Sequence, residues 1–217
     1  MKLSPNLIDH AAEALAAVMR FEYPADGVLS RYFRAHANLG QQDRGFIAET
    51  VFAVLRRKRL LDHLLGDTGA RAMILACLAV LRGNNLRELA AVCSAPELEQ
   101  LGAIKQRAHE ALPFEVECDL PDWVIEKLRA SGHGYAGDDA ALLELARGLQ
   151  RPAPLDLRIN LARTTREAAL AALLASGVAG TAMTYSPAGI RLKDKPALSR
   201  HSLYVEGAIE VQDEGSQ

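Results

Sequence analysis

The sequence is poor in cysteine and in aromatic residues, and it has no long apolar run. Its three cysteines, Cys77, Cys93 and Cys118, form no CxxC pair and match no zinc-ligand spacing. An odd cysteine count without a disulfide framework favours a reducing compartment. No stretch reaches the roughly 18 apolar residues that a membrane-spanning helix needs. Asp9 and His10 also lie where a secretory signal would be apolar. We therefore expect a cytoplasmic protein that does not enter a membrane.

The sequence also lacks the patterns that identify a cofactor or a metal site. No glycine-rich loop follows a predicted strand, so the residues themselves predict no nucleotide-type cofactor site. The histidines are scattered and predict no metal site: they are His10, His36, His63, His109, His133 and His201. Cys77 lies in an apolar segment that favours a buried structural thiol, and no cysteine has an evident electropositive environment. We therefore predict no catalytic residue in this chain.

Charge is unevenly distributed along the chain, whose net charge of −2 does not by itself indicate nucleic acid binding. Residues 1–60 contain nine Lys/Arg and six Asp/Glu, residues 61–150 eight and fourteen, and residues 151–217 eight and seven. The clearest basic cluster consists of Arg56, Arg57, Lys58 and Arg59. These cations either contact phosphates, with release of counterions, or form a solvated face that the helix C-terminal dipole favours.

Helical periodicity dominates the first half of the sequence. Ser4 and Pro5 are typical of a helix start, as N-cap and first-turn residue, and apolar residues then recur at helical spacing. Further helices are predicted around residues 28–33, from about Asp43 to about Leu65, and over 70–82, 86–93 and 96–112. The segment 70–82 is apolar nearly all round, so we expect a central helix that is buried on every side. These helices and their short connections indicate a compact all-α bundle.

The pattern changes after residue 113. Helices are predicted over residues 121–130 and 138–150, and Pro152 and Pro154 end the second one. Residues 155–161 alternate between apolar and polar, which predicts a strand whose inward side chains are Leu155, Leu157, Ile159 and Leu161. A capping box from Thr164 to Glu167 predicts a helix over 165–176. Strands are expected near 180–185, 189–193 and 207–212, which gives a small β-α-β-β-β unit.

Three residues of the second half are candidates for contacts. Arg158 and Asn160 share one face of the predicted strand, where they bind phosphates and base edges, hold another domain, or form a solvated face. Trp123 lies at a helix start. We expect it to be a packing anchor between the bundle and the α/β unit rather than a residue that stacks on a base.

The last six residues, Gln212–Gln217, directly follow the last predicted strand. Asp213 and Ser216 are good helix N-caps, so the sequence stops where a new helix would begin. This position favours a truncated chain over a natural C-terminus.

Three stretches together resemble the Fmu/Sun (RsmB-like) family of ribosomal RNA cytosine methyltransferases. Asp43-Arg44 with residues 49–57 (ETVFAVLRR) is similar to the family's NusB-like N-terminal domain. Residues 120–123 (LPDW) and 153–160 (APLDLRIN) are similar to the lead-in to its small α/β subdomain. Gly207 with residues 211–217 (VQDEGSQ) resembles the segment that enters the methyltransferase fold. The order and spacing of the three stretches carry the resemblance, which covers nearly the whole chain.

The resemblance implies both a fold and an activity. It implies a NusB-like all-α RNA-recognition domain over residues 1–116, and a helical linker with a small α/β (RRM-like) subdomain over residues 117–217. The full-length parent would be an S-adenosylmethionine-dependent RNA cytosine-5 methyltransferase. One cysteine would attack carbon 6 of the cytosine, and a second would help to release the product. Those parts lie beyond Gln217, so we expect this chain to bind no S-adenosylmethionine and to be inactive alone.

The implied partner is structured RNA, most of all ribosomal RNA, bound by a monomer. The predicted RNA-contacting residues are Arg56, Arg57, Lys58, Arg59, Arg158 and Asn160. One alternative is a stand-alone NusB-like RNA-binding factor of transcription antitermination or ribosome assembly, although the α/β unit after Pro154 speaks against it. The other is a helical protein-interaction domain without an RNA role, which the negative net charge leaves open.

Overall fold

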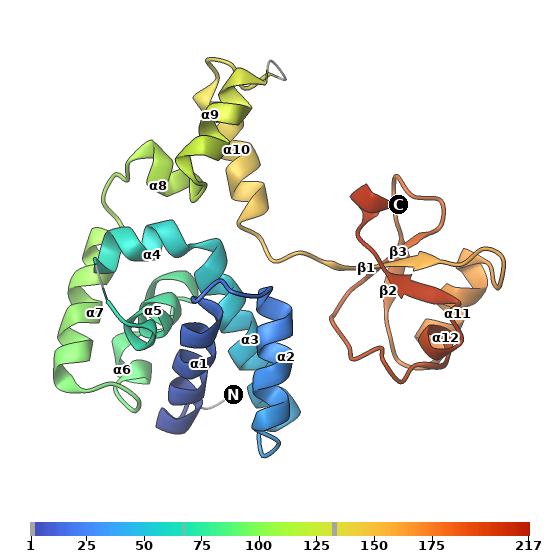
Figure 1. The fold of residues 1–217 in the computed structure, drawn as a ribbon, viewed down its shortest axis with the longest axis horizontal. Coiled ribbons are helices and arrows are strands. Elements are labelled where there is room, and N and C mark those ends of the chain that lie inside the picture. Colours follow the sequence, from blue (N-terminus) through green and yellow to red (C-terminus); the bar gives the residue numbers. More distant parts are fainter. Residues whose placement is uncertain (1–2, 67, 132–133) are drawn as a thin grey trace. The chain divides into compact units, whose positions relative to one another are not determined.

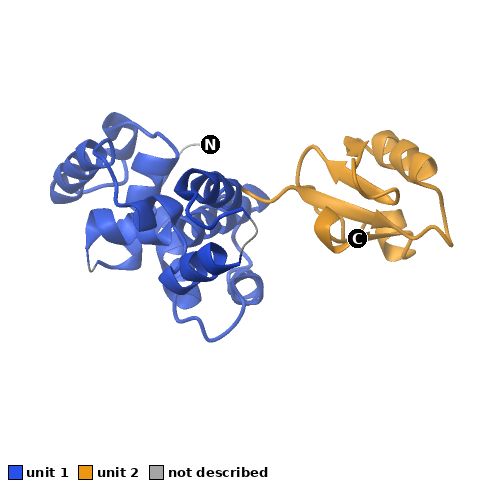
Figure 2. Ribbon diagram, turned by 90° about the horizontal axis from the view of Figure 1, so that it is seen from above, with its two compact units in different colours: residues 1–151 blue, residues 152–217 orange. Residues whose placement is uncertain are grey.

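The computed structural model describes residues 3–66, 68–131 and 134–217. The chain forms two compact units, residues 1–151 and residues 152–217 (Figure 2). Each unit has a hydrophobic core of its own. Among the described residues, no single helix has the length and apolar composition to cross a membrane, and one pair, bent by 104°, meets that test only when taken together.

Unit 1 is helical (Figure 1). Its first helix begins as predicted, because the Ser4 hydroxyl accepts a hydrogen bond from the Leu7 N–H at 3.3 Å. The elements are α1 (Pro5–Val18), α2 (Ala25–Ala35), α3 (Gln41–Arg56), α4 (Lys58–Leu65), α5 (Ala70–Ala76), the π-helix η1 (Cys77–Leu81), α6 (Leu86–Leu89), α7 (Ala95–Arg107), α8 (Phe114–Cys118), α9 (Asp122–Ala130) and α10 (Asp139–Leu149).

Helix α5 is the centre of the bundle. It contacts α1, α3, α4 and α7, and Figure 1 shows these helices around it. Ile74 and Leu75 are buried, as are the other apolar side chains of its second half. The prediction of a central buried helix is therefore confirmed. The end of the helix predicted over residues 70–82 differs from the prediction, because η1 is a π-helix: the Arg82 N–H donates to the Cys77 carbonyl at 3.1 Å, an i→i+5 bond.

The prediction of one helix from residue 43 to residue 65 was wrong. The backbone leaves the helical region at Arg57 (φ −120°, ψ 27°), and α4 starts directly after it. The cause lies far along the chain. The carboxylate of Asp119 accepts hydrogen bonds from the N–H groups of Arg59 and Leu60, at 2.8 and 3.2 Å. It thus caps α4 as an N-cap side chain would, although it comes from another segment.

Helices α8 to α10 pack within unit 1 and enclose a small second cluster. Its buried members are Cys118, Ile125, Leu142 and Ala146. The sequence analysis grouped residues 117–150 with the second domain and missed the short helix α8. The two compact units divide after Arg151, and within unit 1 helix α8 contacts both α4 and α10.

Unit 2 is a four-stranded antiparallel sheet with two helices. Its elements are β1 (Leu155–Ile159), α11 (Arg166–Ala175), β2 (Gly180–Ala182), β3 (Gly189–Leu192), α12 (Ser202–Val205), β4 (Ile209–Val211) and the 3₁₀ turn η2 (Glu214–Ser216). The strand order is β2-β3-β1-β4, with β1 paired to both β3 and β4. This β-α-β-β-α-β sequence of elements is that of ferredoxin-like folds. The predicted unit lacked α12, a helix of only four residues.

The core of unit 2 lies between the sheet and α11. Leu157 and Ile159 of β1 pack there against Ala169 and Leu173 of α11. The predicted inward face of β1 is therefore confirmed up to Ile159. Leu161 was predicted to face inward as well, but it is 62% exposed, because the strand ends at Ile159 and the chain turns away.

Candidate nucleic-acid interface

Two members of the basic cluster at residues 56–59 hold the turn at Asp119. The Nε atom of Arg57 donates to the Asp119 carboxylate at 2.7 Å, and that carboxylate is 1% exposed. Burial raises the pKa of Asp119, while the hydrogen bonds from Arg57 and the backbone act in the opposite direction. Arg59 donates to the Leu120 carbonyl at 2.6 Å and pairs with Asp122 at 2.7 Å. The guanidinium groups of Arg57 and Arg59 therefore stabilise the fold of unit 1 by binding the segment from Asp119 to Asp122.

The other two members of the cluster differ from each other. Lys58 pairs with Asp62 one turn further along α4, at 2.6 Å. Arg56 is half-buried at the end of α3 and has no acidic group within 4.0 Å among the described residues. Burial lowers the pKa of Arg56, and Arg82 acts in the same direction. Within the cluster, Arg56 is thus the cation that a phosphate would reach without displacing an acid.

The second predicted surface lies on unit 2, where the sheet is hollowed by about 390 Å³. The hollow is lined by Arg158, Ile159, Asn160, Leu161, Ala188, Gly207, Ile209 and Glu210. It thus brings the end of β1 next to β4 and the segment before it. The two predicted residues of this unit, Arg158 and Asn160, lie together in its wall.

Arg158 is held loosely. Its guanidinium is half exposed and lies 3.4 Å from the Gln212 side-chain oxygen and 3.5 Å from the Glu210 carboxylate. Such an exposed ion pair contributes little, about 0–1 kcal/mol, so the guanidinium can turn to another acceptor at small cost. A hydrogen-bond-accepting ligand at Arg158 would therefore compete with Glu210, the carboxylate that also lines the hollow.

Asn160 has a structural role beside its place in the hollow. Its amide nitrogen donates to the Gly207 carbonyl at 3.2 Å, and its amide oxygen accepts from the Ala162 N–H at 3.2 Å. These bonds fix the turn after β1 and the approach to β4. Asn160 therefore shapes the rim of the hollow, whereas Arg158 is the freer polar group.

A third polar group on the same sheet was missed by the sequence analysis. Asp156 is 3% exposed, and Arg191 of β3 forms a two-pronged ion pair with it, with both N–O distances at 2.8 Å. The hydrogen bond from Arg191 lowers the pKa of Asp156. Glu214 of η2 lies 3.7 Å from the same guanidinium. The sequence signal was there, since Asp156 alternates with the apolar residues of β1, but the strand register was needed to place Arg191 opposite.

Two further residues were given roles from the sequence. Trp123 is 65% exposed at the start of α9, so it does not anchor the core of its own unit. Cys77 is buried, as predicted, and burial raises its pKa to about 11, which disfavours the thiolate form. Burial also raises the pKa of Cys93 and that of Cys118.

The chain is similar to proteins of one family. Residues 120–199 match the family described as "Methyltr_RsmF/B-like, ferredoxin-like domain". The chain is 27% identical over 237 aligned residues to the "Probable ribosomal RNA small subunit methyltransferase B" of Synechocystis sp.. That alignment covers 94% of this chain and 52% of the relative, so the chain spans about half the length of the curated relative that it matches.

A solved structure has a similar fold. The crystal structure of PH0851 matches with a TM-score of 0.63 at 15% sequence identity, over 99% of this chain and 54% of that one. The family match spans α9, α10, β1, α11, β2 and β3, and it ends before α12 and β4. The family match and the alignment with the Synechocystis relative support the resemblance of this chain to the Fmu/Sun (RsmB-like) family.

Proposed function

We propose that residues 1–217 are the RNA-recognition portion of a ribosomal RNA cytosine-5 methyltransferase, and that methyl transfer takes place in polypeptide outside these residues. The similarity to a probable ribosomal RNA methyltransferase over 94% of the chain supports the proposal. S-adenosylmethionine would supply the methyl group. The described residues do not fit that cofactor, because they contain no glycine-rich turn between a parallel strand and a helix. We assign it to none of them.

The observation that carries the proposal is the hollow beside Arg158, within the ferredoxin-like segment. A half-exposed guanidinium in a concave, partly apolar surface suits RNA, because it can pair with a phosphate or donate to a base edge. Four-stranded sheets of related shape bind unpaired RNA bases in other proteins. We assign the unit the task of holding a single-stranded stretch near the target cytosine, with Arg158 as the main contact and Asn160 at the rim.

Unit 1 would add contacts to the RNA backbone as a NusB-like domain. Of the predicted cluster, Arg56 is the first candidate because it has no acidic partner among the residues that the structure describes. Arg57, Lys58 and Arg59 would each have to exchange an acidic partner, respectively Asp119, Asp62 and Asp122, for a phosphate. By the exposure of the partner, such an exchange costs less at Lys58 and Arg59, whose carboxylate partners are 41% and 69% exposed, than at Arg57, whose partner is 1% exposed.

The test is a titration of the chain with labelled ribosomal RNA fragments by fluorescence anisotropy at several salt concentrations. Affinity should fall steeply as salt rises, and Arg158→Ala should weaken binding by roughly 5- to 150-fold, the loss of about 1–3 kcal/mol. Arg200→Ala, an exposed arginine of the same unit outside the hollow, is the matched control. Binding that is absent, or that resists salt, would count against the proposal.

A stand-alone NusB-like factor is the competing function. The ferredoxin-like match favours the methyltransferase reading, because that segment carries the family description. Assaying methyl incorporation by the longest protein that the parent gene encodes would separate the two.

A further inference from the structure

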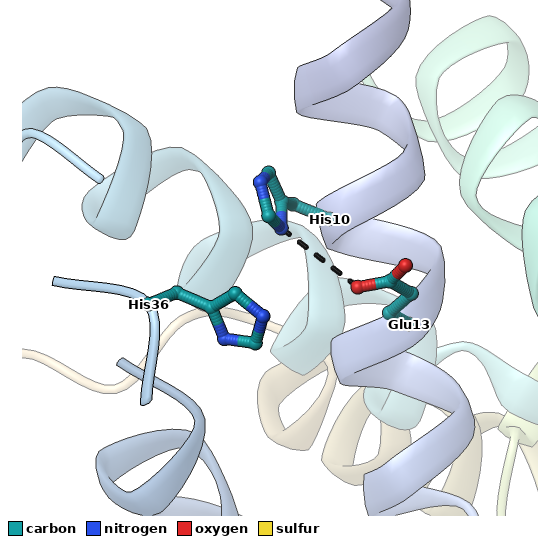
Figure 3. A group of neighbouring side chains, drawn as sticks. All are labelled: His10, Glu13 and His36. Atoms are coloured by element: carbon teal, nitrogen blue, oxygen red, sulfur yellow. Dashed lines mark ion pairs between the residues drawn. The ribbon is translucent and has the colours of Figure 1, made fainter. Parts of the chain in front are cut away.

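Three potential metal-binding side chains converge on one side of unit 1 (Figure 3). His10 and Glu13 lie three residues apart on α1, so both side chains point from the same face of that helix. His36 follows the last residue of α2, which packs against α1. One ligand atom from each of the three lies within 4.8 Å of the others. The sequence analysis expected no such cluster, because His10 and His36 are brought together only by the packing of the two helices.

Tyr32 holds two of these groups in place. Its hydroxyl donates to the Glu13 carboxylate at 2.8 Å and lies 2.7 Å from Nδ1 of His10. With the hydroxyl proton directed at Glu13, Nδ1 of His10 donates to the tyrosine oxygen in the metal-free chain, and a metal ion at Nδ1 requires the other tautomer, with the ring proton on Nε2. Burial raises the pKa of Tyr32, and the hydrogen bond to Glu13 adds to the effect. The neutral hydroxyl thus keeps His10 and Glu13 turned toward each other.

His36 is oriented as a metal-binding histidine usually is. Its Nδ1 lies 2.9 Å from the Tyr32 carbonyl oxygen, which can only accept, so Nδ1 carries a proton and Nε2 has a lone pair. The His36 ring also stacks on Tyr32, with 4.1 Å between ring centroids. Histidine ligands typically donate their second ring N–H to a backbone carbonyl in this way, which fixes the tautomer and the ring direction.

The carboxylate of the cluster also lacks a cationic partner. Among the described residues, Glu13 has no Lys or Arg within 4.0 Å, and its one ion-pair contact is His10 at 3.8 Å. Two imidazoles and a carboxylate with no counterion form a donor set that suits a borderline-soft divalent ion.

We propose that His10, Glu13 and His36 form a binding site for a divalent transition-metal ion, of which Zn²⁺ is the best match. Zinc accepts two histidines and a carboxylate in a tetrahedral arrangement, with a fourth position for water or for the Tyr32 hydroxyl. Ligand atoms around zinc lie about 3.3–3.5 Å apart, given bonds of about 2.0–2.1 Å. The three side chains must therefore close by about 1 Å, which half-buried and exposed groups at a surface can do. The bound ion would link α1 to the end of α2.

The experiment uses the chain free of any affinity tag and stripped with a chelator. Addition of Zn²⁺ should raise its melting temperature, and Co²⁺ should give the visible absorption of a four-coordinate ion at one equivalent. Mg²⁺ should do neither, because it prefers oxygen ligands and six-fold geometry. Glu13→Gln and His36→Ala should each raise the Zn²⁺ dissociation constant by at least about tenfold, since even indirect supports of metal sites have effects of that size. His109→Ala, an exposed histidine elsewhere in unit 1, should leave it unchanged.

The proposal fails if Zn²⁺ leaves the melting temperature unchanged, or if Glu13→Gln binds Zn²⁺ as tightly as the parent chain. Glu13 is exposed, so this variant should fold even if His36→Ala does not. The variant Tyr32→Phe distinguishes a metal-binding site from a hydrogen-bond network that binds no metal. A network without metal predicts a lower melting temperature and no response to Zn²⁺, whereas a metal site predicts that Zn²⁺ restores part of the lost stability.

Discussion

Arg57 and Asp119 form an ion pair across 62 residues of sequence, with Nε 2.7 Å from the carboxylate. The pair joins the start of α4 to the turn between α8 and α9. Asp119 adopts a left-handed backbone conformation (φ 54°), which aspartate tolerates better than most residues. One carboxylate thus caps α4 and holds the guanidinium of Arg57, the residue at which α3 ends.

Replacing Asp119 by alanine should destabilise unit 1 strongly. The substitution leaves a half-buried guanidinium and two N–H groups without an acceptor, so we expect the free energy of unfolding to fall by about 3–5 kcal/mol. Asp119→Asn should cost less, because asparagine keeps an acceptor oxygen and tolerates the left-handed backbone. Urea denaturation followed by circular dichroism measures both. The control is Asp122→Ala, an exposed partner of Arg59 whose loss should cost about 1 kcal/mol or less. Equal losses for Asp119→Ala and Asp122→Ala would contradict the capping role.

Substitution of Arg56 and of Arg57 should change different properties of the chain, although the two residues are adjacent. Arg56→Gln should lower the magnitude of the salt slope of RNA binding by about one and leave the melting temperature nearly unchanged, because Arg56 has no acid partner among the described residues. Arg57→Gln should lower the melting temperature, because it breaks the pair with Asp119. Anisotropy titrations and thermal melts on the same two preparations check both. The assignment is wrong if Arg56→Gln binds RNA with the parent salt slope.

Acid should destabilise unit 1 partly through Glu97. The hydrogen bond from Arg71, with a further one from the Ser94 N–H, lowers the pKa of Glu97 to about 2. A carboxyl whose pKa is lower when folded stabilises the fold above its unfolded value of about 4.3, and this stabilisation is lost as the pH falls toward 2. Glu97→Gln should therefore be less stable than the parent at pH 6 and closer to it at pH 2.5. Glu99→Gln, an exposed residue of the same helix, should run parallel to the parent throughout.

Shortening a buried side chain of the central helix α5 should lower the free energy of unfolding of unit 1. Ile74→Ala removes a fully buried side chain of α5 and should cost about 2–5 kcal/mol. Leu149→Ala removes a mostly exposed side chain of α10 and should cost less than about 0.5 kcal/mol. Because the chain has two cores, calorimetry should be used to follow the unit 1 transition separately. A small effect of Ile74→Ala would contradict the central position of α5.

The sequence predicts most elements that its local patterns control. Ser4 starts α1, the apolar segment after residue 70 forms the buried centre, and the alternation after Leu155 forms β1. The errors arise where a residue distant in sequence determines the local backbone conformation. The break between α3 and α4 at Arg57 depends on Asp119, and the sequence pattern near residue 57 does not predict it. Short helices such as α8 and α12 were not predicted, because four or five residues are too few to show a helical period of apolar residues.

The candidate sites follow the same division. The shared face of Arg158 and Asn160 was visible from alternation along a single strand. The pairing of Asp156 with Arg191 required the register between two strands, and the convergence of His10 with His36 required the packing of two helices. Composition and local pattern identify which side chains are polar and on which face, whereas tertiary contacts decide which of them are already engaged.

Within the described residues, none of the three apolar clusters draws side chains from both sides of the junction between Arg151 and Pro152. A recombination event at that point would therefore divide none of these clusters. In evolutionary terms, each half could carry its own apolar cluster or clusters intact through such an exchange.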